Sequence, residues 1–501
     1  MLPSPRRSAP RRTARPERRR RLGPLAALAA ALALPLPAAA SAQLAASPAA
    51  AGATTRSPAA STAAAFHGSA TAVPSIVGAP TIRVQDPSPL SIAQCVATIK
   101  IRCYTPVQYR VAYNLNSLYR KNITGQGQTI VIVDSFGSPT IRNDLQVFDR
   151  QWGFPNPPQL DVYKFGNVPA FDKNNAAMVG WAEETTLDVE YAHAIAPGAK
   201  IVLAETPVAE TEGVTGFPQM MAAEKYLIDH GIGDVISQSF GATENTFPSK
   251  GSYSSLQSLR YAFADAARHH VTVLGAAGDS GATDDKIDGA TLYPYKVDSW
   301  PSTDPLVTSV GGTQLVLAQD GNRVRPDQVW NDGYGAGGGG VSGVFARPAF
   351  QNGAANVVGG RRGTPDIAMS SAVNGGCWVY ESFEPSGAGW EIFGGTSEAT
   401  PMFAGIVALA GQVAHHRLGN INPALYSLGA LSQANNAQAS TGQAKNRPAR
   451  NTGIVDVTTG NNSFGNVNGY TAGPGYDLAS GWGTVNAAAF VPALAHAVTS
   501  H

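Results

Sequence analysis

Gly394-Gly395-Thr396-Ser397-Glu398-Ala399-Thr400-Pro401 is the most informative stretch of this chain. A Gly-Gly-Thr turn places a serine directly before an apolar run with helical spacing: Met402, Phe403, Ile406, Val407, Ala410 and Val413. The spacing predicts a buried helix that carries Ser397 at its mouth. The first N–H groups of a helix lack partners inside it, so the serine offers an exposed hydroxyl and an amide for a developing oxyanion. The alternative is a serine that only caps the helix.

The rest of the chain alternates strand and helix patterns. Continuous β-branched and apolar runs predict buried strands at residues 129–134, 199–204, 234–239 and 271–276. Helical patterns lie between them, at 220–230 and 254–270. This alternation predicts an α/β fold with a mostly parallel central sheet and helices on both faces. Ligand sites in such folds lie at the carboxyl ends of the strands.

A serine nucleophile needs a base, and an acidic segment supplies a candidate. Glu184 and Asp188 are four residues apart, so on a helix they share a face. Two facing carboxyls cannot both ionise freely, so one pKa rises, and a shared proton would let Glu184 accept from Ser397 while Asp188 orients it. The alternative is a solvated acidic helix face.

Asp279 follows the strand pattern at 271–276, where an α/β fold places a site residue. A carboxyl donates a hydrogen bond to an oxyanion only when it is protonated. Asp279 as an oxyanion donor therefore implies work at acidic pH. The alternative is an ordinary Asp-Ser-Gly turn.

A Ser/His scheme is the rival mechanism. The sequence has no His-Gly-Thr string, and His193 is the best remaining histidine base. We expect His193 to be a packed or hydrogen-bonded side chain instead.

Taken together, these motifs resemble the sedolisins, the serine-carboxyl peptidases of subtilisin-like fold. The pattern E-x-x-x-D, then G-D-x-G, then G-T-S-x-x-x-P occurs here in that order, within a resemblance that covers about residues 104 to 497. The resemblance implies Ser397 as nucleophile, Glu184 as base and Asp188 as its partner. It also implies Asp279 as oxyanion donor and peptides or proteins as substrates.

The resemblance also implies one bound Ca²⁺ near the C-terminus. The matching residues are Asp456, Val457, Gly473, Gly475 and Asp477. Two carboxylates with backbone carbonyls form an all-oxygen shell that suits a hard cation, and glycines let the backbone approach it closely. The alternative is two ordinary aspartate turns.

The N-terminal region has the sequence features of an export signal. Residues 1–42 combine nine arginines, an apolar run and an Ala-x-Ala site, which predicts a signal peptide and a secreted or periplasmic protein. Residues 43–103 are a low-complexity propeptide or linker, shorter than the large folded prodomain of typical sedolisins, and 104–497 form the peptidase domain. As an alternative, residues 80–103 belong to the mature enzyme.

Bulk composition narrows the function classes further. Beyond the arginine-rich start, acidic residues outnumber basic ones, so we expect no nucleic-acid partner. We also expect no membrane insertion after signal removal, and a monomer. Cys95 and Cys103 are close enough in sequence to bridge, which would leave Cys377 as a free, buried thiol, although the sequence leaves the pairing open. A catalytically silent secreted binding protein is the alternative from another class.

Overall fold

The computed structural model describes residues 77–78, 88–247, 253–384, 387–440 and 451–499. The predicted signal peptide and most of the segment 43–103 lie outside these ranges. Within the described residues, no helix combines the length and apolarity that crossing a bilayer requires.

A central sheet of eight strands organises the chain. Seven of its strands run parallel, and β11 alone pairs antiparallel, at the end of β10. The path runs β11 (Gln328–Val329), β10 (Thr308–Gln314), β8 (Thr272–Ala276), β6 (Val235–Gln238), β3 (Thr129–Ser135), β5 (Lys200–Thr206) and β4 (Leu160–Lys164), and β14 (Ile367–Ser370) also pairs with β10. The four predicted strands are therefore β3, β5, β6 and β8.

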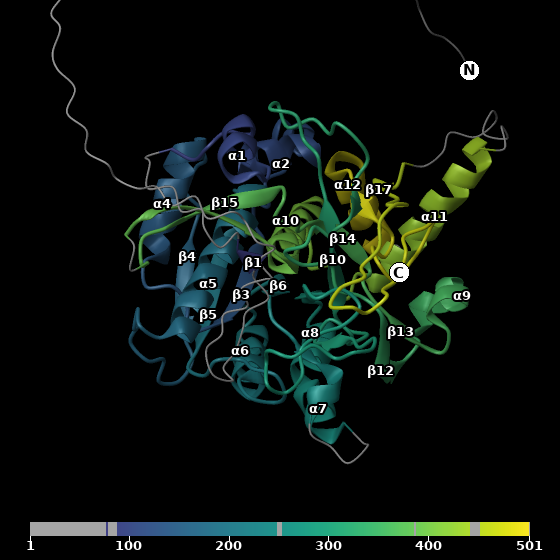
Figure 1. Cartoon of the computed structure of the whole chain (residues 1–501), viewed down its shortest axis with the longest axis horizontal. Coiled ribbons are helices and arrows are strands. Elements are labelled where there is room, and N and C mark those ends of the chain that lie inside the picture. Colours follow the sequence, from purple (N-terminus) through teal and green to yellow (C-terminus); the bar gives the residue numbers. More distant parts are fainter. Residues whose placement is uncertain (1–76, 79–87, 248–252, 385–386, 441–450, 500–501) are drawn as a thin grey trace, which may run out of the picture. The chain divides into compact units, whose positions relative to one another are not determined.

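Helices cover both faces of this sheet, as the sequence predicts. Along β3, Ile130 and Ile132 belong to the core that contains α5 (Ala176–Ile195) and α10 (Thr396–Ala414). Val131 and Val133 point into the opposite core, with α6 (Phe217–Asp229) and α8 (Tyr261–Arg268). Because successive side chains of a strand point to opposite faces of the sheet, β3 contributes residues to two separate hydrophobic cores. Figure 1 shows α10 in the middle of the fold, beside β6, β10 and β14.

One helix prediction needs correction. The pattern at 254–270 forms two helices, α7 (Ser254–Leu259) and α8, which meet at Arg260. The Arg260 guanidinium pairs with the buried Asp304 and lies over the Phe345 ring. These tertiary contacts hold the junction and override a continuous local pattern.

A second, four-stranded sheet leads into the serine motif. Its order is β1 (Val77–Gly78), β16 (Gly389–Gly394), β15 (Gly376–Glu381) and β2 (Cys103–Tyr104). A disulfide joins Cys95 of α1 (Ile92–Ile99) to Cys103, and Cys377 is free and buried. Residues 88–103 are therefore attached to the folded unit, whereas the boundary at residue 103 stays a prediction.

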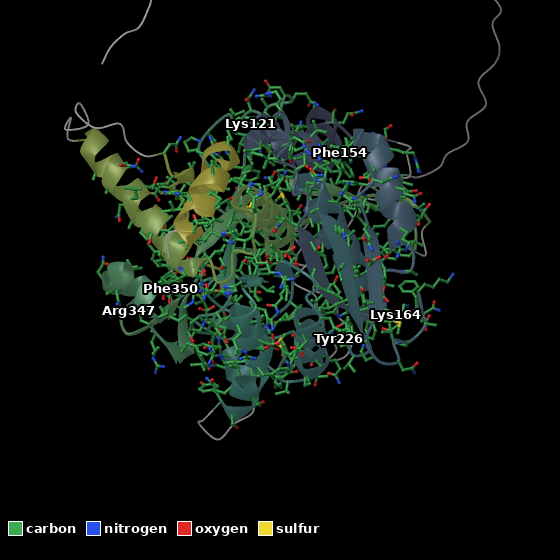
Figure 2. All side chains as sticks on the ribbon, turned by 180° about the vertical axis from the view of Figure 1, so that it is seen from behind. Lys121, Phe154, Lys164, Tyr226, Arg347 and Phe350 are labelled. Atoms are coloured by element: carbon green, nitrogen blue, oxygen red, sulfur yellow. A yellow bond between two sulfur atoms is a disulfide. The ribbon has the colours of Figure 1, made fainter. Side chains whose placement is uncertain are left out.

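The remaining elements surround these layers. They are α2 (Pro106–Ala112), α3 (Asn116–Tyr119), α4 (Ile141–Trp152), α9 (Ala355–Val358), α11 (Asn422–Ser440), α12 (Ala487–Thr499), β7 (Ala242–Thr243), β9 (Ser299–Trp300), β12 (Val341–Ala346), β13 (Arg361–Gly363), β17 (Ile454–Val455) and β18 (Thr484–Val485). Phe350, labelled in Figure 2, packs its ring 5.0 Å from that of Tyr426 in α11.

Gly405 sets how closely α10 approaches α5. A Cβ at this position would lie 2.7 Å from the Ile195 Cβ and 3.3 Å from the Ala192 carbonyl oxygen. Only glycine allows this approach, because real Cβ atoms do not come so close to their neighbours.

We predict that Gly405→Ala pushes α10 away from α5 and lowers the free energy of unfolding by about 1 to 3 kcal/mol. Chemical denaturation measures this change. Gly353→Ala is the matched control, since a Cβ there meets nothing within 4 Å. Equal stabilities of the two variants would contradict the close-approach argument.

Candidate active site

The turn before α10 holds the candidate nucleophile in place. Gly395 has φ +104 and donates its N–H to the Ser371 carbonyl oxygen at 2.6 Å. A Cβ on Gly394 would lie 2.6 Å from that same oxygen, so the turn requires both glycines. Ser397 is the second residue of α10 and is fully buried. Pro401, four residues on, has no N–H to donate to the Ser397 carbonyl in the helix.

The two candidate carboxyls lie inside the protein. Glu184 and Asp188 are both on α5 with no exposed surface, so the reading as a solvated acidic helix face is wrong. Burial raises the pKa of Glu184 well above its usual range, and the carboxyl of Asp188 adds to this rise. An interaction with the Ser397 side chain lowers the same pKa. The structure thus brings Ser397, Glu184 and Asp188 together.

Asp188 also has partners of its own. Burial raises its pKa well above the usual range, the carboxyl of Asp134 adds to this rise, and interactions with Ser239 and Glu184 lower it. The Ser239 hydroxyl donates to Asp188 Oδ1 at 2.8 Å from the segment after β6. The carboxyls of Glu184 and Asp188 therefore titrate as a coupled pair, in which the loss of one proton makes the loss of the second less favourable.

Asp134 is a residue that the motif reading missed. It lies in β3, fully buried, and its carboxyl raises the pKa values of both Glu184 and Asp188. Burial raises the pKa of Asp134 itself to about 7. The sequence offered one signal for Asp134: it ends a predicted strand, and ligand sites in α/β folds lie at the carboxyl ends of strands.

Asp279 is hydrogen-bonded to the first residue of α10, the helix that carries the candidate nucleophile. Its Oδ1 accepts the Thr396 N–H at 2.7 Å and the Thr396 hydroxyl at 2.8 Å. Its other oxygen, Oδ2, is buried and has no hydrogen-bond partner among the described residues. Burial raises the pKa of Asp279 to about 7, so below that pH Oδ2 carries a proton that it can donate.

His193 lies elsewhere. Its Nε2 is 2.8 Å from the Pro155 carbonyl oxygen and 3.1 Å from Asp149 Oδ1, with the ring fully buried. It stands nine residues after Glu184 on α5, which is roughly 13 Å along a helix. The structure therefore gives His193 the packed, hydrogen-bonded position that the sequence predicts.

The residues expected to hold calcium lie close together. The Gly475 N–H donates to Asp456 Oδ2 at 2.8 Å, and the Gly473 N–H donates to Asp477 Oδ2 at 2.9 Å. The Ser480 hydroxyl can donate to the Val457 carbonyl oxygen at 3.3 Å or to Asp477 Oδ1 at 3.1 Å. Asp456 Oδ1 is buried without a hydrogen-bond partner, and no ion pair among the described residues involves either aspartate. An orphaned carboxylate oxygen with no cation beside it fits a hard metal ion.

A second acidic group was not foreseen from the sequence. Glu183, Glu381 and Glu384 bring carboxylate oxygens within 4.8 Å of one another, close enough to hold a metal ion. Glu381 and Glu384 come from the end of β15 and the segment after it, so the sequence separates them from Glu183 by almost 200 residues.

Comparison with known proteins places the chain in a family. The sequence model of the subtilase family matches residues 170–483. The chain is 33% identical to kumamolisin of Bacillus sp. (strain MN-32) over 393 residues, and 26% identical to sedolisin of Pseudomonas sp. (strain 101) over 408 residues. It spans 62% of the length of each of these relatives, and 76% and 79% of this chain are covered. Tripeptidyl-peptidase 1 of Canis lupus familiaris is 29% identical, over 62% of this chain and 51% of that protein.

A solved structure supports the same assignment. Pseudomonas sedolisin, a serine-carboxyl proteinase complexed with two molecules of pseudo-iodotyrostatin, superposes with a TM-score of 0.63 at 26% identity. The match covers 80% of this chain and 99% of that one. The chain therefore belongs to the subtilase family and, within it, to the sedolisins.

Proposed function

We propose that this protein is a serine-carboxyl endopeptidase that hydrolyses peptide bonds in proteins at acidic pH. The observation that carries the proposal is the position of Asp279. Thr396, the neighbour of Ser397, holds one oxygen of this carboxyl, and the other oxygen is buried without a partner. A protonated carboxyl held by the residue next to a serine nucleophile can donate a hydrogen bond to the negative charge that develops on a carbonyl oxygen.

The proposed steps use the residues already described. Ser397 attacks the scissile carbonyl while its proton passes to Glu184, and Asp188 shares the charge of that carboxyl pair. The tetrahedral oxyanion accepts hydrogen bonds from Asp279 and from the amide of Ser397. Glu184 returns the proton to the leaving amine, and water then releases the acyl group by the same route in reverse. The effect of the Ser397 side chain on the pKa of Glu184 supports this assignment.

Export, a monomeric state and calcium binding complete the proposal. The arginine-rich, apolar start supports secretion to the outside or the periplasm. Asp456, Val457, Gly473, Gly475 and Asp477 would hold one Ca²⁺, which would neutralise the two carboxylates and stabilise the C-terminal loops. The orphaned Asp456 Oδ1 is the structural support for the ion.

Ser397→Ala tests the proposal directly. We expect the wild type to cleave internally quenched peptides at acidic pH, and the variant to lose at least about a thousandfold in kcat, because the nucleophile is removed. The exposed Ser258→Ala serves as the control with wild-type activity. Equal cleavage by wild type and Ser397→Ala would instead favour the silent binding protein. Mass spectrometry of the products separates internal cleavage from tripeptide release.

A second prediction concerns the alkaline limit of activity. Since Asp279 must be protonated to donate, we expect kcat to fall as pH rises through its pKa of about 7. Asp279→Asn keeps a donor that does not titrate, so this fall should move to higher pH. Asp279→Ala should lose about a hundredfold or more in kcat at every pH. An unchanged alkaline limb in Asp279→Asn would show that another group sets it.

For calcium, we expect a chelator to lower the melting temperature of the wild type. Saturating ion at a hundred times its Kd contributes about 2.7 kcal/mol. Asp456→Asn should remove most of this sensitivity, whereas the exposed Asp320→Asn should retain it. A wild-type melting temperature that does not respond to the chelator would rule the ion out.

A further inference from the structure

The loop that carries Asp279 depends on its neighbours for its shape. Residues 277–282 follow β8 and belong to no helix or strand, and we refer to them as the Asp279 loop. A loop of this kind keeps one conformation only where its backbone groups find partners outside it. Thr396 supplies one set of partners, at the carboxyl of Asp279 and at the Gly278 N–H. Two further segments, which the proposed mechanism does not use, bind the backbone of the loop.

The first of these segments is a glycine-rich run at 335–340, which is buried throughout and which we call the glycine segment. The Ala336 N–H donates to the Asp279 carbonyl oxygen at 2.9 Å, and the Ala336 carbonyl oxygen accepts the Gly281 N–H at 2.8 Å. A single residue of the glycine segment therefore holds the loop at Asp279 itself and two residues after it.

The glycine segment also holds the loop on the other side of Asp279. The Gly338 N–H donates to the Gly278 carbonyl oxygen at 2.7 Å. A Cβ on Gly338 would overlap the Ala277 carbonyl oxygen, and a Cβ on Gly335 would lie 2.9 Å from the Asp279 carbonyl oxygen. The two backbones can approach this closely only because both positions lack a side chain.

The second segment is a hairpin at 460–472, which we call the C-terminal hairpin. Two backbone hydrogen bonds join its arms: the Ala472 N–H donates to the Gly460 carbonyl oxygen at 3.0 Å, and the Asn462 N–H donates to the Tyr470 carbonyl oxygen at 3.1 Å. Asn462 has no exposed surface. Asparagine is seldom fully buried, because its amide must then find partners inside the protein.

Asn462 finds these partners in three different segments. Its backbone carbonyl oxygen accepts the N–H of Ala282, the last residue of the Asp279 loop, at 2.9 Å. Its Nδ2 donates to the Gly339 carbonyl oxygen in the glycine segment at 3.3 Å. Its Oδ1 accepts the Tyr470 N–H within the hairpin at 2.7 Å. One buried residue therefore joins the hairpin, the glycine segment and the Asp279 loop.

The contact between the hairpin and the loop is as close as the atoms allow. A Cβ on Gly281 would overlap the Asn462 carbonyl oxygen and would lie 2.9 Å from the Phe464 Cβ. Packing of this density transmits a displacement from one segment to the next. A shift of Asn462 is therefore expected to move the backbone that carries Asp279.

We propose that Asn462 is a positioning residue for the oxyanion donor, because it fixes the glycine segment and the Asp279 loop in one arrangement through Gly339 and Ala282. This inference rests on the proposed function of Asp279 and adds the residue that sets its place. Asn462 acts only through the loop. An oxyanion donor must lie within about 2.7–3.1 Å of the position that the oxyanion will occupy, so a small displacement weakens stabilisation of the transition state more than binding of the substrate.

Asn462→Ala removes both side-chain hydrogen bonds and tests the proposal. We expect kcat at acidic pH to fall by about tenfold to a hundredfold, with KM unchanged, because misplacement by a fraction of an ångström acts on the transition state. Asn468→Ala changes an exposed asparagine of the same hairpin and should keep the kcat of the wild type. Wild-type kcat in Asn462→Ala would overturn the proposal.

A double-mutant cycle separates positioning from a general loss of stability. In Asp279→Ala no donor is left to misplace, so adding Asn462→Ala should leave the residual kcat unchanged. The fall in melting temperature caused by Asn462→Ala should be the same in both backgrounds, since the same hydrogen bonds are lost. An equal fall of kcat in both backgrounds would show that Asn462 only stabilises the fold, and would overturn the positioning role.

Gly469→Ala gives a second test, which decides the question if Asn462→Ala does not fold. A Cβ on the half-buried Gly469 would overlap Asn462 Oδ1, so this variant displaces the amide without removing it. We expect the same selective fall in kcat, again absent in the Asp279→Ala background, and an unchanged kcat would count against the proposal. These outcomes leave the peptidase proposal intact. If Asp279→Ala retains wild-type kcat, or the wild type cleaves no peptide at any pH, the proposed function itself fails.

Discussion

The contact between α5 and α10 is the constraint on which the site depends. One helix carries Glu184 and Asp188, the other begins at Thr396, and the two lie against each other because Gly405 has no side chain to meet Ile195. Both helices are almost entirely buried, so neither can shift without opening the core. The separation between the serine and its candidate base is therefore fixed by packing about two turns along α10 from Ser397.

A second linkage joins the two candidate catalytic loops. Thr396 bonds to Asp279 through its amide and its hydroxyl, and that hydroxyl also accepts the Gly278 N–H at 3.1 Å. One threonine thus positions both the start of α10, with the candidate nucleophile, and the proposed oxyanion donor. The arrangement is preorganised, so little reorganisation has to accompany the development of charge.

Much of this arrangement could be predicted from sequence, and the remainder has identifiable causes. The runs at β3, β5, β6 and β8 are so strongly apolar that only buried parallel strands fit them. Asp279 could be predicted as a site residue because it follows the end of β8. Glu184 and Asp188 were recognisable because a helix places residues four apart on one face. Asp134 ends a predicted strand but matches no motif, and the group of Glu183, Glu381 and Glu384 joins α5 to a segment almost 200 residues away, so the sequence did not single out either of them. The break at Arg260 escaped prediction for the same reason, since Asp304 holds it from a distant part of the chain.

Because several buried carboxyls bind protons more tightly in the folded than in the unfolded chain, the stability of the fold depends on pH. Burial raises the pKa of Asp134 and Asp279 to about 7, and that of Glu224 and Glu398 to about 8, whereas carboxyls in an unfolded chain titrate near pH 4. Their contribution to stability is complete below about pH 4 and is lost as pH rises toward 7 to 8, because over that interval folding takes up protons from solution. This is the reverse of the usual dependence for ion-paired acids. We therefore expect an acidic medium to favour the folded state and a neutral one to lower its free energy of unfolding, so the change of pH that removes the proton proposed for Asp279 also loosens the scaffold around it.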